Sequence, residues 1–232
     1  IKVANESVEL LDLRPHLARM RMVKQPVELE LLQQAIDITA DTLLRLKKKG
    51  WQKFAYEHEV EAAITANFRS SGSTHAYQPI VAAGKNACTL HYVHNNDAIE
   101  EGSLLLLDVG AEVHNYAADI TRTYIVGEPT KRQQQVLDAV LDVHLFACDF
   151  LKPGILIRDY EESVQQYMGE KLRELGLIKS IEQSTVRHYY PHATSHFLGL
   201  DVHDVADYER PLEPGMVLTV EPGIYIPEEG IG

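Results

Sequence analysis

The strongest constraint on the fold lies between residues 101 and 124, where an apolar strand carries a carboxylate. Four consecutive leucines at positions 104–107 run directly into Asp108, and Asp119 follows eleven positions later, again among apolar residues. Short apolar runs joined by a polar segment are typical of a β-hairpin. The two aspartates therefore belong to one hairpin, and the position of its turn decides how they face each other.

A turn centred on Val113 and His114 predicts that Asp108 lies directly opposite Asp119, on the same face of the sheet. Two carboxylates that face each other within an apolar sheet repel each other and are poorly solvated. A cation between them is the simplest compensation, so the hairpin predicts a metal site. The alternative is a solvated turn capped by one aspartate, which the four preceding leucines disfavour.

Composition excludes several classes of function. The 232 residues are 45% hydrophobic and 24% charged, which suffices for one large domain or two small ones. The net charge of −12 argues against a nucleic-acid partner, which requires a basic surface. No apolar run approaches the roughly 20 residues of a membrane span, so we expect no membrane partner. Cys88 and Cys148 are flanked by apolar residues, which favours free thiols in a reducing, cytoplasmic compartment.

Four segments with helical spacing of apolar residues predict helices, at about 26–49, 56–70, 130–152 and 157–175. Pro26 suits a first helical position, and Thr130 with Gln133 forms a capping box. Segments 77–81 and 88–93 are expected to be strands, the second carrying His91. Residues 1–24 are interpreted as a linker from a missing N-terminal domain, and residues 25–232 as one catalytic domain.

The two halves of the chain repeat each other. Their helical parts align at an offset of 104, and their strand parts align at an offset of 113. The alignment matches Asp108 with Glu221 and brings His91 within one residue of His203. The repeat predicts two halves of two helices and two strands each, packed as a pseudo-dimer around one sheet. Carboxylates from both halves would then converge where the halves meet.

Asp108, Asp119, Glu221 and one histidine would form an oxygen-rich site, which suits Mn²⁺, Co²⁺ or Zn²⁺ better than a thiolate-binding metal. Three carboxylates carry more charge than one ion usually needs, so two ions about 3.5 Å apart are expected. Such a pair supports hydrolysis by activating water and polarising a carbonyl. His192 and His196 lack the glutamate of a helical zinc motif, so only His196 is expected to be a ligand.

Four motifs together resemble the catalytic domain shared by Xaa-Pro aminopeptidase (aminopeptidase P) and prolidase. They are Leu-Leu-Leu-Asp-Val-Gly at 105–110, Ala-Asp-Ile-Thr-Arg-Thr at 118–123, and the segments 195–204 and 213–225. The resemblance covers the chain from about residue 15 to residue 232. It implies an α+β pita-bread fold, shared with methionine aminopeptidase, in which two pseudo-symmetric halves pack helices outside a curved antiparallel sheet.

The resemblance also implies a dinuclear metallopeptidase, usually with Mn²⁺, that cleaves the bond before a proline. The residues that match its metal ligands are Asp108, Asp119, His196 and Glu221. Glu221 also matches the acid/base that handles the proton of the attacking water. The residues that match its catalytic, substrate-binding histidines are His91, His192 and His203. Its substrates would be peptides with proline in the second position.

Two departures from the family's pattern concern the site. Ala193 stands where the family commonly has glycine, and the family's fifth ligand, a glutamate beyond a Gly-Ile-Gly, has no counterpart because the sequence stops at Gly232. We therefore interpret the chain as part of a longer protein, which is expected to form a dimer or tetramer. Without that glutamate, this chain is expected to bind its ions more weakly than the full-length protein.

Three functions stay open at this point. The first is an Xaa-Pro aminopeptidase, which is a metal-dependent exopeptidase. The second is a prolidase restricted to Xaa-Pro dipeptides, which shares every motif above. The third is a non-catalytic pita-bread binding module, which is disfavoured because such relatives typically lose the metal ligands that this sequence keeps.

Overall fold

The computed structural model describes residues 11–232 and has an α+β architecture. Its helices are α1 (Arg14–Met22), α2 (Pro26–Lys49), α3 (Glu57–Ser70), α4 (Lys131–Phe150), α5 (Ile157–Glu174) and α6 (Gln183–Tyr189), with 3-10 turns at η1 (Trp51–Lys53) and η2 (Gly84–Cys88). Its strands are β1 (Thr74–His75), β2 (Ile80–Ala83), β3 (Leu104–Val109), β4 (Ala111–Val113), β5 (Tyr116–Ala117) and β6 (Ile120–Ile125).

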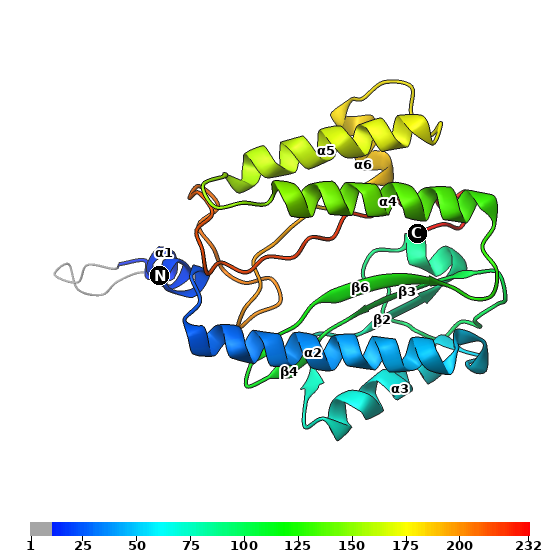
Figure 1. Cartoon of the computed structure of the whole chain (residues 1–232), viewed down its shortest axis with the longest axis horizontal. Helices are drawn as coiled ribbons and strands as arrows, with labels where there is room; N and C mark the ends of the chain where they lie inside the picture. Colours follow the sequence, from blue (N-terminus) through cyan, green and yellow to red (C-terminus); the bar gives the residue numbers. More distant parts are fainter. Residues whose placement is uncertain (1–10) are drawn as a thin grey trace, which may run out of the picture.

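Two helix pairs enclose the sheet that contains β2, β3 and β6. In Figure 1, α4 and α5 lie above this sheet, α2 and α3 lie below it, and the C-terminal segment (orange to red) runs between the two pairs. Each pair has its own core. The core beside α2 and α3 includes Phe68 and Leu105, and the core beside α4 and α5 includes Tyr160 and Met168. All four side chains are fully buried. Among the described residues, no helix combines the length and apolar character needed to cross a bilayer.

Local signals place the helix ends close to the predicted ones. A capping box between Gln25 and Glu28 begins α2, and Gly50, with φ of +93°, ends it. Thr130 accepts a hydrogen bond from the Gln133 backbone N–H at the start of α4, and the Gln133 side chain accepts one from the Thr130 N–H. The predicted capping box and the four main helices are therefore confirmed, with shifts of one or two residues.

The hairpin forms, but its turn lies one residue further along than predicted. His114 and Asn115 both adopt positive φ, of +48° and +68°, which is the backbone of a tight hairpin turn. Asp108 therefore lies opposite Thr121, and the prediction that it faces Asp119 directly is wrong. Because the register differs by two residues and not by one, Asp108 and Asp119 still lie on the same face, as diagonal neighbours.

The second half contains an antiparallel pair of extended segments, 194–198 and 217–221. The Leu198 N–H donates to Val217, the Thr219 N–H to His196, and the Glu221 N–H to Thr194, at 2.9–3.0 Å. These contacts repeat the pairing of β2 with β3, in which Ile80 lies opposite Asp108. A helix pair followed by two antiparallel segments thus recurs in the same order, as the internal repeat predicts. Among the described residues the second-half segments are joined by the isolated Phe197–Leu218 bridge and form no regular strands, so the predicted second strand pair in one shared sheet is not observed.

The predicted strand at 88–93 is absent from the described structure. Residues 84–88 form η2, a turn follows, and His91 adopts a positive φ of +56°. The cause is the buried carboxylate of Glu57, which accepts hydrogen bonds from the Asn86 amide at 3.0 Å and from the Tyr92 hydroxyl at 2.8 Å. These bonds hold the segment against the start of α3 and away from a sheet edge. The strand expected at 77–81 occurs at Ile80–Ala83.

Part of the segment interpreted as a linker is helical. Residues 14–22 form α1, and Met22 at its end is buried beside Phe197 and Leu212. Residues 1–10 lie outside the described part of the chain. The division into a linker over 1–24 and a domain over 25–232 stays a prediction.

Candidate metal centre

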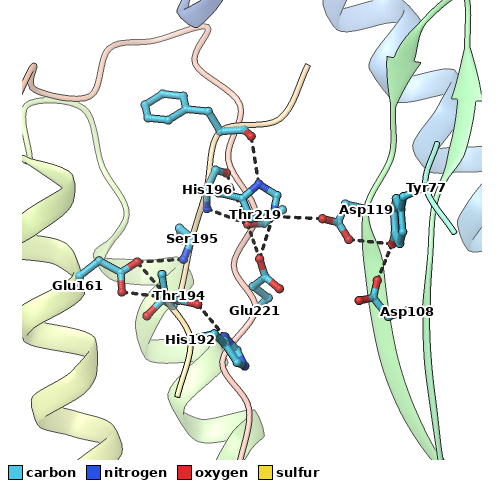
Figure 2. Close-up of polar contacts among 12 residues, drawn as sticks. Tyr77, Asp108, Asp119, Glu161, His192, Thr194, Ser195, His196, Thr219 and Glu221 are labelled. Atoms are coloured by element: carbon cyan, nitrogen blue, oxygen red, sulfur yellow. Dashed lines mark hydrogen bonds and ion pairs between the residues drawn. The ribbon is translucent and has the colours of Figure 1, made fainter. Parts of the chain in front are cut away.

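Three of the four predicted ligands converge between the two halves. Asp119, His196 and Glu221 each offer a ligand atom, and these atoms all lie within 4.8 Å of one another. The His196 Nε2 atom lies 3.2 Å from Asp119 Oδ2 and 3.0 Å from Glu221 Oε1 (Figure 2). Asp119 comes from the first half, and the other two come from the paired segments of the second half. The predicted convergence of both halves is therefore observed.

Asp108, the fourth predicted ligand, is joined to this cluster through a residue that the sequence did not single out. The Tyr77 hydroxyl lies 2.5 Å from Asp108 Oδ1 and 2.9 Å from Asp119 Oδ1 (Figure 2). Burial and the two carboxylates raise the pKa of Tyr77 well above its usual range. A β-carbon on Gly110 would overlap the Ala118 carbonyl and lie 2.8 Å from the Tyr77 ring, so this glycine allows the tyrosine to reach both aspartates.

The electrostatics of the cluster favour a cation. Burial, the charge of Asp119 and, to a smaller degree, that of Glu221 raise the pKa of Asp108 to about 7. Burial disfavours a charged His196, but its hydrogen bonds to Asp119 and Glu221 outweigh this and raise its pKa to about 10. Without metal, protons on Asp108 and His196 therefore reduce the repulsion among the three carboxylates. A metal ion bound among them would neutralise the same charge.

The donors fit a divalent ion. The Nδ1 atom of His196 lies 3.0 Å from the Phe197 carbonyl, to which only an N–H can donate, so Nε2 is directed at the carboxylates. Carboxylate oxygens and an imidazole nitrogen suit hard or borderline metals such as Mn²⁺ and Zn²⁺. Thr219 supports both second-half ligands, because its hydroxyl accepts from the His196 N–H and donates to Glu221, each at 3.0 Å.

Glu161, near the start of α5, anchors the segment that leads to His196. Its carboxylate accepts hydrogen bonds from the Thr194 N–H at 2.9 Å and from the Ser195 N–H at 2.9 Å (Figure 2). Sequence reasoning assigned Glu161 no role. The internal repeat carries a signal for this role, because it aligns Tyr160-Glu161 with Tyr56-Glu57, and Glu57 is also a carboxylate that holds a neighbouring segment.

The three predicted substrate histidines have different surroundings. The His203 ring meets the His196 ring edge-on, with centroids 4.4 Å apart. His192 donates from Nδ1 to the Ala193 carbonyl and accepts from the Tyr225 hydroxyl at Nε2, both at 2.8 Å. His91 is exposed on its turn, and within residues 11–232 it makes no hydrogen bond to the cluster. Of the three, the structure thus brings His203 against a predicted ligand, while His192 is held by Ala193 and Tyr225.

Comparison with known proteins identifies the family. Residues 30–232 match metallopeptidase family M24, and the chain belongs to this family.

The chain is 41% identical to the Xaa-Pro aminopeptidase of Haemophilus influenzae over 95% of its own length and 54% of that protein's length. It is 39% identical to the Xaa-Pro aminopeptidase of Escherichia coli, over 94% and 52% of the two lengths. The chain spans about half the length of the curated relatives that it matches.

Solved structures agree with this assignment. Proline aminopeptidase P II from Yersinia pestis superposes with a TM-score of 0.87 at 40% identity, covering 95% of this chain and 53% of that one. Aminopeptidase P from E. coli with the inhibitor Pro-Leu gives a TM-score of 0.89 at 38% identity, covering 96% and 53%. These likenesses confirm the predicted pita-bread fold.

Proposed function

We propose that this chain is the catalytic part of an Xaa-Pro aminopeptidase, which removes the N-terminal residue from peptides with proline in the second position. The observation that carries the proposal is the convergence of Asp119, His196 and Glu221 between the two halves, with Asp108 joined through Tyr77. The names of the relatives support this substrate class.

The proposed cofactor is a pair of divalent ions, with Mn²⁺ preferred and Zn²⁺ or Co²⁺ as alternatives. The residues proposed to hold them are Asp108, Asp119, His196 and Glu221. Bound ions supply Lewis-acid chemistry and lower the pKa of a coordinated water. Metal binding would replace the contacts of His196 Nε2 with Asp119 and Glu221, because the ions would supply the positive charge that His196 carries without metal.

In the proposed reaction, Glu221 takes the proton of the attacking water and returns it to the leaving amine. Its side chain is 30% exposed, so both solvent and substrate can reach it. His203 stands beside the cluster, where an imidazole N–H can stabilise charge that develops on the scissile carbonyl. His192 is proposed to bind the substrate, since its own Nδ1–H is already bonded to the Ala193 carbonyl. His91 is proposed to complete the substrate site from its exposed turn.

The decisive experiment compares three peptides with Mn²⁺-loaded protein: Arg-Pro-Pro, Arg-Ala-Pro and the dipeptide Arg-Pro. An Xaa-Pro aminopeptidase releases arginine from Arg-Pro-Pro and leaves Arg-Ala-Pro largely intact. Cleavage of Arg-Pro alone would establish the prolidase alternative. Binding of Arg-Pro-Pro without turnover in metal-saturated protein would establish the non-catalytic module and refute the proposal.

We further propose a cytoplasmic protein that forms a dimer or tetramer, with peptides as its partners and no nucleic acid. Light scattering of the whole natural protein tests the assembly, and a monomer at micromolar concentration would contradict it.

A further inference from the structure

A buried ion pair adjoins His203, and neither of its residues is a proposed metal ligand or substrate residue. The side chains of Lys24 and Asp204 are each only 1% exposed, and Lys24 Nζ lies 3.1 Å from Asp204 Oδ2. The Arg21 guanidinium contacts the other oxygen of Asp204 and lies 2.7 Å from Asp201. Two cations from the segment before α2 thus bind two carboxylates from a loop 180 positions later in the chain.

The backbone on both sides of the pair is fixed as well. The Lys24 N–H donates to the Gly215 carbonyl at 2.9 Å, and the Asp204 N–H donates to the Phe197 carbonyl at 2.9 Å. A β-carbon on Gly199 would overlap the Asp204 carboxylate and lie 3.0 Å from Lys24 Nζ. The ion pair therefore packs directly on bare backbone, and the loop from Gly199 to Asp204 is shaped around it.

Stability alone does not account for this arrangement. Burying two charges carries a large desolvation cost, which offsets most of their attraction, so apolar residues of similar volume are often at least as stable. What the pair gains is a single geometry for the loop. The residue directly before Asp204 is His203, whose ring lies edge-on against His196.

We propose that Lys24, Asp204 and Arg21 form a positioning device that holds His203 against the metal centre. Segment 21–24 would then contribute to the active site by positioning His203. The catalytic consequence rests on the proposed function, in which His203 faces the substrate. The geometric consequence, a fixed His203 ring, does not depend on it.

The test uses the paired substitution Lys24→Met with Asp204→Asn, which removes both charges and keeps the side-chain volumes similar. The matched control is Lys171→Met with Asp142→Asn, which removes a 2.9 Å ion pair between α5 and α4 that contacts none of the site residues. With Arg-Pro-Pro, the first variant should lower kcat/KM by about 10-fold to 100-fold, the range for misplacing a catalytic group or losing its supporting contact. The control should stay within about twofold of wild type.

A second background separates positioning from general damage. In His203→Ala protein, the Lys24/Asp204 substitutions should change kcat/KM by less than about threefold, because residues that act through one another are not additive. An unchanged, fully additive loss in that background would refute the proposal. Wild-type kinetics in the first variant would refute it as well.

A measurement without turnover keeps the inference separate from the proposed function. In Zn²⁺-loaded protein, the ring Cε1–H resonance of His203 should shift and broaden in the first variant and stay unchanged in the control. An unchanged resonance would overturn the positioning role even if no peptide is cleaved. If the paired variant does not fold, Arg21→Met removes the more exposed arm of the device, and the same shift and non-additivity are then expected at smaller size.

Discussion

Metal binding at pH 7 should release about 1.5 protons from the metal-free protein at saturation. With a pKa of about 10, His196 is fully protonated at pH 7, and with a pKa of about 7, Asp108 is half protonated. Both groups must lose their protons to serve as ligands. His196 therefore contributes about one proton and Asp108 about half of one, and the ions must displace both.

The same values set the pH dependence of affinity. Displacing a proton from His196 at pH 7 costs about 4 kcal/mol, since its pKa lies about three units higher and each unit is worth 1.36 kcal/mol. The apparent affinity should rise about tenfold per pH unit between pH 8 and pH 9, where only His196 still holds a proton. Below about pH 6 the dependence should steepen towards a hundredfold per unit, because Asp108 is then protonated too.

Calorimetry in buffers of different ionisation enthalpy measures the proton count directly. The observed binding enthalpy, plotted against the ionisation enthalpy of PIPES, ACES and Tris at pH 7, has a negative slope whose magnitude is the number of released protons. Asp108→Asn is the matched control, because it should remove about half a proton and leave the contribution of His196. Tight binding with a slope near zero would refute the reasoning, because it would mean that His196 is not a ligand or carries no proton.

The stability of the metal-free protein should follow the same groups. Folding raises the pKa of both Asp108 and His196, so each contributes stability below its unfolded pKa and loses that contribution as the pH rises through its folded pKa. Between about pH 5 and pH 9 the Tm of the metal-free protein should therefore fall. A Tm that rises over this window in metal-free protein would contradict the assignment.

Three substitutions test single residues of the centre. Glu221→Gln keeps the side-chain shape but cannot accept the water's proton, so kcat should fall about 10²-fold or more with little change in Tm, and full activity would remove Glu221 from the mechanism. Tyr77→Phe should weaken metal affinity about 10-fold to 100-fold in a calorimetric titration, the range for lost outer-shell partners. Glu161→Gln weakens charge-assisted bonds to backbone N–H groups such as that of Thr194 and should lower the free energy of unfolding by about 1–3 kcal/mol. The control is Glu162→Gln at the exposed neighbouring residue, which should leave the free energy of unfolding measured in denaturant unchanged. Equal effects of the two substitutions would contradict the anchoring role of Glu161.

Local sequence signals located the helices and the hairpin because the forces involved are local. Capping boxes and helix-ending glycines act within four residues, so the ends of α2 and α4 could be placed within two residues. The hairpin turn was misplaced by one residue because Asn115, which tolerates positive φ, was not given the second turn position. That error shifted the register by two residues, an even number. Asp108 and Asp119 therefore still lie on the same face of the sheet.

Features that depend on long-range partners could not be predicted in the same way. The alternation around His91 is typical of a strand, yet the buried Glu57 captures that segment into a turn. The pair of Lys24 and Asp204 joins segments 180 positions apart, and neither residue stands out in its own neighbourhood. Charge and burial alone do not say which distant partner a residue meets.

The internal repeat explains why the centre has its ligands where it does. Asp108 lies opposite Ile80 in the first half, and Glu221 lies opposite Thr194 in the second, so the two carboxylates occupy equivalent register positions. Two residues further along the partner strands stand Ala82 in one half and His196 in the other. The buried alanine leaves the first half without an imidazole at that position, and its second ligand comes instead from Asp119, just before β6. The duplicated frame therefore fixes where ligands can stand, and the divergence of the two halves decides which positions bear a carboxylate, an imidazole or neither.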